Sequence, residues 1–321
     1  MTQASSGAEG ASCLPKVSVL MTVYNGAAVL QEAVDSLLAQ SLDDFELIIV
    51  DDGSTDQTPA IIAALDDPRI VKLHPGRNIG RTPALNLALE AARAPYVAVL
   101  DADDIDHPDR LRCEAELLDQ NPDVLLVGSW SHVVSLKDNK PLYDFTPATE
   151  NLRQQLGFDN PISHSSSMYR RKEALAVGGY PLQFRYAQDY ALWVRLAAIG
   201  EVMVIPAYLL TLRHHDANMS FTAAYSAARA YDGWAITCLA LEMIPLSPEN
   251  RKIALATKAK LQTLYALSLM RERRYGKGFW LGVTAFLSHP VSLSRLFWKK
   301  LRPKIGNILR FLHLLPPLQD I

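Results

Sequence analysis

The chain has 321 residues, of which 49% are hydrophobic, so it is long enough for one large domain with a substantial core and a smaller additional part. Its formal net charge of -2 argues against nucleic acid as the main partner, because a protein that neutralises phosphates needs a basic surface. The three cysteines lie far apart and form no CxxC pair, so the sequence indicates neither a zinc site nor a disulfide framework.

Residues 1–14 are small and polar and lack the basic and apolar segments of a signal peptide, so we expect a flexible tail there. No run in the sequence approaches the roughly 18 apolar residues that span a bilayer. Together with the scattered cysteines, these features predict a cytoplasmic protein.

From Pro15 the sequence alternates between short apolar runs and helical periodicity. Val17–Val23 predicts a strand that ends at the turn signal Tyr24-Asn25-Gly26. Apolar residues at i, i+4, i+7 and i+8 from Leu30 then predict a helix with one apolar face. Such alternation predicts a mostly parallel α/β sheet with helices on both faces. The further strands are expected over 46–50, 70–73, 96–100 and 123–128, and the second helix carries Leu85, Ala88, Leu89 and Ala92.

Acidic and polar side chains follow the ends of three of these strands. Because the carboxyl ends of parallel strands meet at the edge where open α/β sheets bind ligands, we expect the side chains to share one cleft. A cluster of carboxylates without Cys or His suits Mg²⁺ or Mn²⁺ better than zinc. A solvated acidic turn before the next helix is the alternative. The residues expected at this edge are Thr22, Tyr24, Asn25, Asp51, Asp52, Asp101, Asp103 and Asp104.

Two glycine-rich phosphate motifs are absent from the sequence. It contains no GxxxxGK[ST] loop, and no GxGxxG turn follows the first strand. If a nucleotide binds, a metal ion held by acidic residues must therefore neutralise most of its phosphate charge.

Four short segments are specific in combination, namely Val23-Tyr24-Asn25, Asp51–Asp56, Asn78-x-Gly80 and Leu100–Asp104. Together they resemble the family 2 inverting glycosyltransferases, which have the Rossmann-like GT-A fold. The resemblance covers about residues 15–220. It implies a nucleotide-sugar donor, usually UDP-linked, with a divalent cation that bridges its diphosphate to the Asp-x-Asp motif. It also implies a glycan or lipid-linked hydroxyl acceptor, as in cell-surface polysaccharide or glycan synthesis.

The resemblance also implies roles for residues near the nucleoside. Thr22 and Tyr24 would line the nucleoside pocket together with Asn25, and Tyr24 would stack near the base. Asp52 would accept a hydrogen bond from the base imide. As alternatives, Tyr24 simply packs in a turn and Asp52 caps the following helix.

Three more residues are assigned to the donor and the metal on the same resemblance. Asp103 would be the principal metal ligand, and Asp101 would meet the ribose or the metal. Arg81 matches a position where some members of the family place an arginine that contacts the donor. The alternative for Arg81 is a surface residue in the first turn of a helix.

The second half of the region contains a small, polar stretch over Asn160–Met168. It resembles the family segment that returns a strand under the sugar, which makes His164 a candidate for the donor-sugar or acceptor pocket. A histidine whose hydrogen bonds are satisfied within the fold is the alternative.

Leu192, Leu196 and Ile199 form an apolar helical stripe, and Asp189 precedes it. The family places its catalytic carboxylate here, which makes Asp189 the candidate general base for the acceptor hydroxyl. Gln188 stands where the family usually has Glu and is assigned to the acceptor or sugar pocket. In the alternative, Asp189 is only the N-cap of the helix.

The segment Thr211–Ser220 contains an Arg-x-His pattern at Arg213. In the family such a segment often lies across the diphosphate, and its histidine can complete the metal shell. His215 fits that spacing, and a pair of surface histidines is the alternative.

Residues 221–321 are expected to form a helical C-terminal region, with a helix that starts at Ser247-Pro248. From Arg271 to Arg310 acidic residues nearly vanish, while basic residues alternate with aromatic ones. This composition suits peripheral contact with an anionic membrane surface. A helical packing domain with a solvated basic face is the alternative.

Two other functions remain open from the residues alone. A phosphotransfer domain would also gather acids at strand ends around Mg²⁺, but it leaves Tyr24, Asn25 and Asp189 without roles. A binding scaffold that keeps the fold and has lost catalysis would not need both Asp103 and Asp189.

Overall fold

The computed structural model describes residues 14–215 and 227–288. Its chain divides into two compact units. The first contains the residues up to Thr149 together with Ile162–Tyr180 and Gly200–His214. The second contains Glu150–Pro161, Pro181–Ile199 and the chain from His215 onward. The predicted tail, apart from Leu14, and the predicted domain boundary at residue 220 lie outside the described residues.

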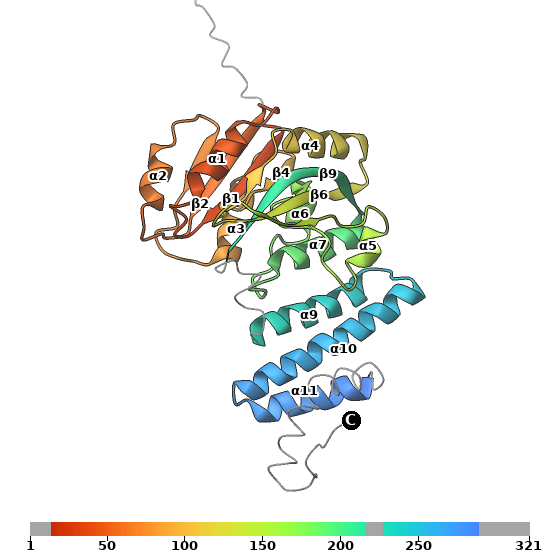
Figure 1. Ribbon diagram of the computed structural model, residues 1–321. Helices are drawn as coiled ribbons and strands as arrows, with labels where there is room; N and C mark the ends of the chain where they lie inside the picture. The colour runs from red at the N-terminus through yellow and green to blue at the C-terminus, as the bar shows by residue number, and fades with distance from the viewer. Residues whose placement is uncertain (1–13, 216–226, 289–321) are drawn as a thin grey trace, which may run out of the picture. The chain divides into compact units, whose positions relative to one another are not determined.

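The first four strands of the first unit pair in parallel in the order β3-β2-β1-β4 (Figure 1). They are β1 (Val17–Val23), β2 (Phe45–Asp51), β3 (Ile70–Leu73) and β4 (Tyr96–Val99). Every residue of β2 and β4 is buried, as expected for parallel strands that are covered on both faces. The predicted order of strands and helices is therefore confirmed in this half.

The rest of the sheet is mixed. In the described part of the chain the sheet has nine strands and continues from β4 through β8, β6 and β9 to β5. β6 and β9 are parallel, whereas β8 is antiparallel to both β4 and β6. The sequence predicted the start of β6 but missed its length and these antiparallel pairings. The strands are β5 (Ile105–Asp106), β6 (Val124–Ser135), β7 (Pro141–Phe145), β8 (Met168–Arg170) and β9 (Glu201–His214).

Helices cover the sheet on both faces. Alternate residues of β1, including Val17 and Met21, share one core with apolar residues of α1 (Leu30–Leu38), α2 (Thr58–Ala64) and α4 (Arg110–Gln120). The intervening residues of β1 point to the opposite face, since side chains alternate along a strand. There α3 (Arg81–Ala91) packs on β1 and β2, and α6 (Arg171–Ala176) follows β8.

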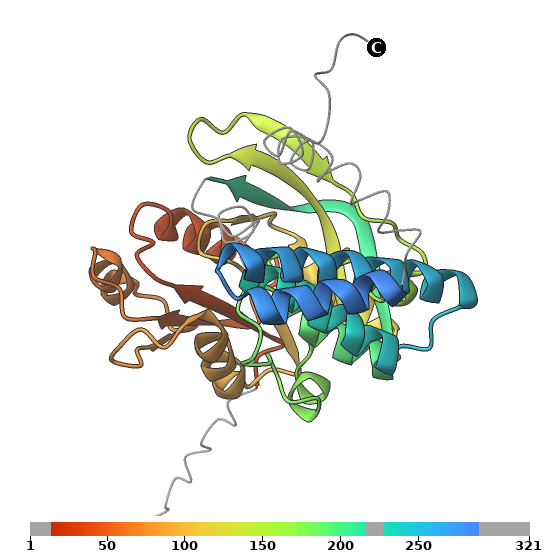
Figure 2. The ribbon, with the colours of Figure 1, turned by 90° about the horizontal axis from the view of Figure 1, so that it is seen from below.

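The second unit is helical, and α10 lies between α9 and α11 (Figures 1 and 2). Ser247 caps α10 by accepting a hydrogen bond from the main-chain N–H of Asn250 at 3.2 Å, as predicted. Leu192 and Leu196 are buried in α7, but Ile199 is 56% exposed, so the predicted stripe ends one turn earlier. The helices are α5 (Leu152–Gln155), α7 (Gln188–Ile199), α9 (Ala227–Met243), α10 (Pro248–Arg271) and α11 (Tyr275–Ser288).

Candidate functional site

The carboxyl end of β4 delivers three carboxylates to one small volume. One oxygen from each of Asp101, Asp103 and Asp104 lies within 4.8 Å of the others. The main-chain N–H of Asp104 donates to the carbonyl of Asp101 at 3.1 Å, which closes the tight turn that brings them together. Asp104 is only 4% exposed, whereas Asp101 and Asp103 are half-buried, so the turn is not fully solvated. These three residues are called the acid cluster below.

Asp101 is held by two side chains. Arg81, the first residue of α3, donates from one terminal nitrogen to both carboxylate oxygens of Asp101, at 2.6 and 2.7 Å. Nδ1 of His164 lies 3.2 Å from Oδ1 of Asp101. Burial would raise the pKa of Asp101, but the Arg81 guanidinium and His164 hold it well below its usual range. Asp101 is therefore a fixed anion.

Asp104 is held in a different way. Ser165 Oγ donates to one of its carboxylate oxygens at 2.5 Å, and the main-chain N–H of Arg213 donates to the other at 3.0 Å. Burial and the charges of the other two members of the acid cluster raise the pKa of Asp104 well above its usual value, although these hydrogen bonds oppose the shift. Three carboxylates so close together repel one another, and a bound cation would relieve that repulsion.

The donor atoms of the acid cluster fit a hard divalent cation. All three residues offer carboxylate oxygens, which are the ligands that Mg²⁺ and Mn²⁺ prefer. Asp103 is partly exposed, whereas Asp101 is clamped by Arg81 and Asp104 is buried. The arrangement therefore agrees with the predicted metal site.

The polar residues after β1 and β2 are joined to one another. The side-chain oxygen of Asn25 accepts from the main-chain N–H of Thr55 at 2.8 Å, and the N–H of Asn25 donates to Ser54 Oγ at 2.9 Å. Asn25 has a positive φ of 53°, which asparagine tolerates better than most residues. Thr22 is half-buried and Tyr24 is 53% exposed, so the Tyr24 ring does not pack inside the turn.

Asp52 is buried and organises the loop that precedes α3. Its two carboxylate oxygens accept from the main-chain N–H groups of Ile79 and Gly80, at 2.6 and 3.0 Å. A carboxylate oxygen has two lone pairs, so each retains room for a second donor. The structure gives Asp52 this local role and leaves its predicted contact with a base as a prediction.

Three predicted residues belong to the second unit. Asp189 is the second residue of α7, and the main-chain N–H of Ala191 donates to the carbonyl of Ala187 at 3.1 Å. Asp189 therefore lies inside the first helical turn, and the N-cap alternative is wrong. Gln188 is buried, and its side-chain oxygen has no hydrogen-bond partner among the described residues. The roles of Asp189, Gln188 and His215 stay predictions.

The sequence did not predict three residues that hold the acid cluster or the neighbouring His164 in place. Ser165 contacts Asp104 and also accepts from the main-chain N–H of Asp101 at 3.1 Å. The guanidinium of Arg213 donates to the carbonyl of Asp103. Tyr180 places its hydroxyl 3.2 Å from Nε2 of His164. In the sequence, only the Arg-x-His pattern and the run of serines gave any indication that these residues contact the acid cluster and His164.

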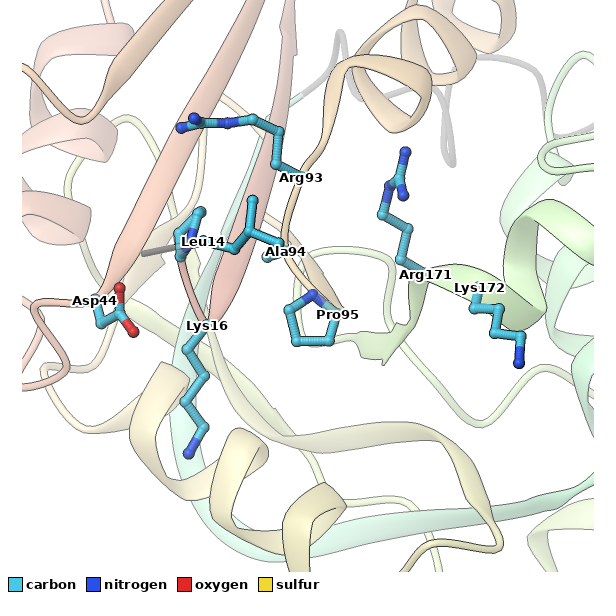
Figure 3. A pocket seen from close by; sticks show the side chains of 9 residues that line it. Leu14, Lys16, Asp44, Arg93, Ala94, Pro95, Arg171 and Lys172 are labelled. Atoms are coloured by element: carbon cyan, nitrogen blue, oxygen red, sulfur yellow. The ribbon is translucent and has the colours of Figure 1, made fainter. Parts of the chain in front are cut away.

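A hollow of about 590 Å³ lies at the opposite edge of the sheet, where β1 and β4 begin (Figure 3). Two of its cations already have carboxylate partners, because Lys16 pairs with Asp119 at 2.6 Å and Arg93 pairs with Glu46 at 2.7 Å. No member of the acid cluster lines this hollow. The candidate site is therefore the acidic edge.

Known proteins resemble the chain in sequence over the same region. A family model described as glycosyl transferase family 2 matches residues 18–178. Succinoglycan biosynthesis protein ExoO of Rhizobium meliloti is 40% identical over 258 residues, which cover 69% of this chain and 71% of that protein. A UDP-Gal:alpha-D-GlcNAc-diphosphoundecaprenol beta-1,3-galactosyltransferase of Escherichia coli is 28% identical over 193 residues, with 58% and 69% covered.

Two solved structures share the fold. S. aureus TarS 1–349 in complex with UDP-GlcNAc superimposes with a TM-score of 0.60 at 19% identity, covering 81% of this chain and 73% of that one. Mannosyltransferase PcManGT from Pyrobaculum calidifontis, in complex with GDP-Man and Mn²⁺, gives 0.59 at 20% identity, covering 88% and 76%. The alternative of a phosphotransfer domain is therefore wrong. The chain has the GT-A fold and belongs to glycosyl transferase family 2.

Proposed function

We propose that this glycosyltransferase is a metal-dependent, inverting enzyme that transfers a sugar from a nucleotide-sugar donor, UDP-linked, to a hydroxyl acceptor. The observation that carries the proposal is the acid cluster at the carboxyl end of β4, in which Asp103 is accompanied by two anchored carboxylates. Two relatives support the donor class, since S. aureus TarS was solved in complex with UDP-GlcNAc and the E. coli enzyme has UDP-Gal in its name.

The metal site would be formed by Asp103 as principal ligand, with Asp101 and Asp104 beside it and His215 as a further ligand. Mn²⁺ and Mg²⁺ are the proposed ions, and a fold relative was solved with Mn²⁺. When bound, the ion supplies Lewis-acid stabilisation of the negative charge that develops on the departing diphosphate. Arg81 contributes a second positive charge next to Asp101.

The nucleoside end of the donor would lie over the ends of β1 and β2. Thr22, Tyr24 and Asn25 line this part, where the exposed Tyr24 ring is available to stack on a base. Asp52 would accept from the base. His164 is assigned to the donor-sugar or acceptor pocket, and because it is buried against Asp101 and Tyr180, it would act there by holding Asp101 in place.

The chemical step needs one base on the acceptor side. We assign it to Asp189, with Gln188 in the acceptor pocket. Asp189 takes the proton of the acceptor hydroxyl as that oxygen attacks the anomeric carbon. The bond from the anomeric carbon to the diphosphate breaks in the same displacement, so the configuration inverts and no second carboxylate nucleophile is needed.

A donor screen tests the function directly. UDP-, GDP- and dTDP-linked sugars would be assayed with and without Mn²⁺ for thermal shift and for slow hydrolysis of the donor. We expect a metal-dependent rise in melting temperature with UDP-sugars and release of UDP. A protein that no nucleotide-sugar stabilises, with or without metal, would instead support the catalytically silent scaffold.

The acceptor is proposed to be a growing cell-surface polysaccharide or glycan on a lipid carrier. ExoO is named for succinoglycan biosynthesis, and AmsE of Erwinia amylovora is an amylovoran biosynthesis glycosyltransferase. The E. coli relative has a diphosphoundecaprenol compound in its name. A lipid-linked acceptor requires the enzyme to work at a membrane surface. We propose that the enzyme lies at the cytoplasmic face of that membrane. None of the described helices is long and apolar enough to cross a bilayer.

Peripheral contact would use the outer face of α11. Small residues of α11 face α10, because a Cβ on Gly278 would lie 2.8 Å from the carbonyl of Ala266, and Ala285 packs against Ala259. Bulky side chains are left outside, which reverses the usual arrangement of a surface helix. The exposed large hydrophobic residues of α11 are Tyr275, Phe279, Trp280, Phe286 and Leu287.

Charge favours an anionic lipid surface as the partner of this face. The residues before and within α11 include Arg271, Arg273, Arg274 and Lys277, all exposed, and the sequence has no Asp or Glu from Arg273 to Gln319. Each cation near an anionic membrane contributes about 1 kcal/mol to binding. The basic residues beyond Ser288 lie outside the described part of the chain.

Replacing Phe279 and Trp280 with Ser is expected to weaken binding to anionic vesicles by at least about tenfold, because a fully buried side chain of this kind contributes about 1.5–3 kcal/mol. Co-sedimentation with phosphatidylglycerol and phosphatidylcholine vesicles measures the effect. Leu182→Ser is the control, since Leu182 is a 68% exposed residue of the same unit. Equal vesicle binding by the wild type and the double variant would favour the alternative, in which this region is a helical packing domain with a solvated basic face.

A further inference from the structure

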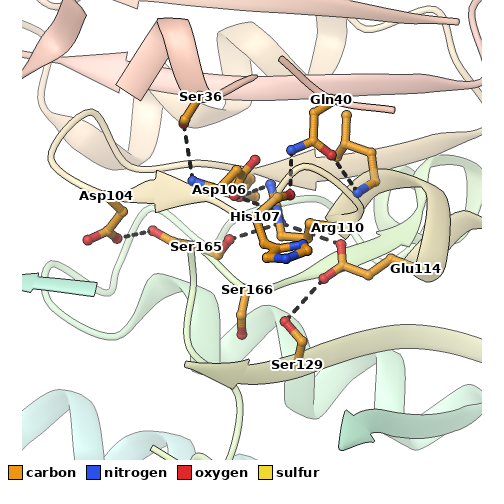
Figure 4. A network of polar contacts seen from close by, with 12 residues as sticks. Ser36, Gln40, Asp104, Asp106, His107, Arg110, Glu114, Ser129, Ser165 and Ser166 are labelled. Carbon is orange, nitrogen blue, oxygen red and sulfur yellow. Dashed lines mark hydrogen bonds and ion pairs between the residues drawn. The ribbon is translucent and has the colours of Figure 1, made fainter. Parts of the chain in front are cut away.

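A buried ionic group lies directly behind the acid cluster, and the proposed reaction gives it no role. Arg110 of α4 is completely buried, with its Nε 2.6 Å from the carboxylate of Asp106 and one terminal nitrogen 3.4 Å from that of Glu114 (Figure 4). Both carboxylates are fully buried as well. Burying three ionisable side chains is costly, and hydrophobic residues of similar volume often stabilise a protein equally well. Stability alone is therefore a weak reason for this group.

Asp106 is the closer carboxylate partner of Arg110. Its carboxylate lies 2.6 Å from Nε, whereas the carboxylate of Glu114 lies 3.4 Å from a terminal nitrogen. Burial raises the pKa of Glu114 to about 8, and the Arg110 guanidinium opposes that shift. The principal ion pair is therefore Arg110 with Asp106, and Glu114 is the more distant neighbour.

The remaining donors of Arg110 reach the main chain that carries the acid cluster. One terminal nitrogen donates to the carbonyl of Val99 at 3.1 Å, and the other donates to the carbonyl of Ser165 at 2.9 Å. Val99 is the last residue of β4, two positions before Asp101. The hydroxyl of Ser165 contacts the carboxylate of Asp104 and the main-chain N–H of Asp101. Arg110 therefore holds both the strand that leads into the acid cluster and the segment that hydrogen-bonds to it.

The neighbouring contacts fix the helix that carries Arg110. Gln40 donates to the carbonyl of His107 at 2.7 Å and accepts from the main-chain N–H of Leu111 at 2.9 Å. Ser36 accepts from the main-chain N–H of Asp106 at 3.1 Å. α1 and the residues just after it thus anchor the turn from β5 into α4 on both sides, as Figure 4 shows.

We propose that Arg110 is a positioning residue for the metal site, which sets the separation of the Asp101 and Asp104 carboxylates by tying β4 to the segment around Ser165. The proposal rests on the proposed metal-dependent function. A guanidinium suits the task because its planar fork of five donors can serve two carboxylates and two carbonyls at once, which the ammonium group of lysine cannot do. Groups that orient metal ligands from behind typically contribute 10–100-fold to metal affinity.

The test measures Mn²⁺ affinity by electron paramagnetic resonance, in the presence of UDP, and melting temperature on the same samples. Arg110→Lys keeps the positive charge beside Asp106 and loses the fork. Arg170→Lys is the matched control, because Arg170 also donates to main-chain carbonyls, those of Val124, Leu118 and Asn121, and none of these belongs to the acid cluster. Both variants are expected to melt at lower temperature than the wild type.

A positioning role predicts that Arg110→Lys weakens Mn²⁺ binding by about 10–100-fold, while Arg170→Lys stays within about twofold of the wild type. A folded Arg110→Lys protein with wild-type Mn²⁺ affinity overturns the role of Arg110 and leaves the metal site standing. A wild-type protein that binds no Mn²⁺ overturns the proposed function as well. If Arg110→Lys does not fold, Ser165→Ala is used in its place. This change removes the hydrogen bond to Asp104 and leaves the ion pairs of Arg110 intact. A Ser165→Ala protein with wild-type Mn²⁺ affinity also overturns the proposal.

Discussion

Replacing Asp103 with Ala is expected to abolish the metal dependence of nucleoside diphosphate binding and to lower the affinity for UDP on the order of 100-fold, which corresponds to about 2.7 kcal/mol. Residues that only orient a metal ligand contribute 10–100-fold, and a direct ligand should contribute at least as much. The sequence offers no glycine-rich loop to bind the phosphates instead. Isothermal titration calorimetry with UDP, with and without Mn²⁺, measures both effects.

The control for this change is Asp43→Ala, because the Asp43 side chain is 96% exposed and lies outside the acid cluster. It should bind UDP like the wild type at every Mn²⁺ concentration. Equal UDP affinity of the wild type with and without metal would contradict the prediction. It would mean that cations such as Arg81 neutralise the diphosphate without a metal ion.

The sequence predicted the acid cluster because its signal is local. An apolar strand followed by Asp101, Asp103 and Asp104 needs only the rule that parallel strands end at a common edge. The partners of these acids could not be predicted in the same way. Ser165 and Arg213 lie 61 and 109 residues from Asp104 along the chain, and they meet it only because β8 and β9 join the sheet out of sequence order.

The same reasoning explains what the sequence missed in the fold. Alternating strands and helices predicted β1 to β4, because a helix directly follows each of β1, β2 and β3, and α4 follows β4 after the short β5. β8 has only three residues, and its antiparallel pairing with β4 and β6 leaves no periodic pattern. The sequence indicated the aromatic residues of α11 but not which face they occupy, because a helix that packs through glycine and alanine has no apolar stripe on its inner side.

Replacing Asp189 with Asn is expected to lower the rate of sugar transfer by about 10²–10⁴-fold while UDP affinity stays unchanged, because a general base typically contributes that much to the rate. Asn has the same shape and cannot accept the proton of the acceptor hydroxyl. The melting temperature should change little, since Asp189 lies in the first turn of α7, where its charge contributes about 0.3–1 kcal/mol through the helix dipole.

Glu249→Gln is the matched control, since Glu249 is an acidic residue in the first turn of α10. It removes the same kind of interaction with a helix dipole and should leave transfer unchanged. UDP affinity and melting temperature would be measured on both variants, and the transfer rate with the donor that the screen identifies and an acceptor that the enzyme is shown to glycosylate. An Asp189→Asn protein that transfers sugar at nearly the wild-type rate would make Asp189 a structural residue. His164 would then be the next candidate for the base, although its burial against Asp101 and Tyr180 requires that side to open to the acceptor.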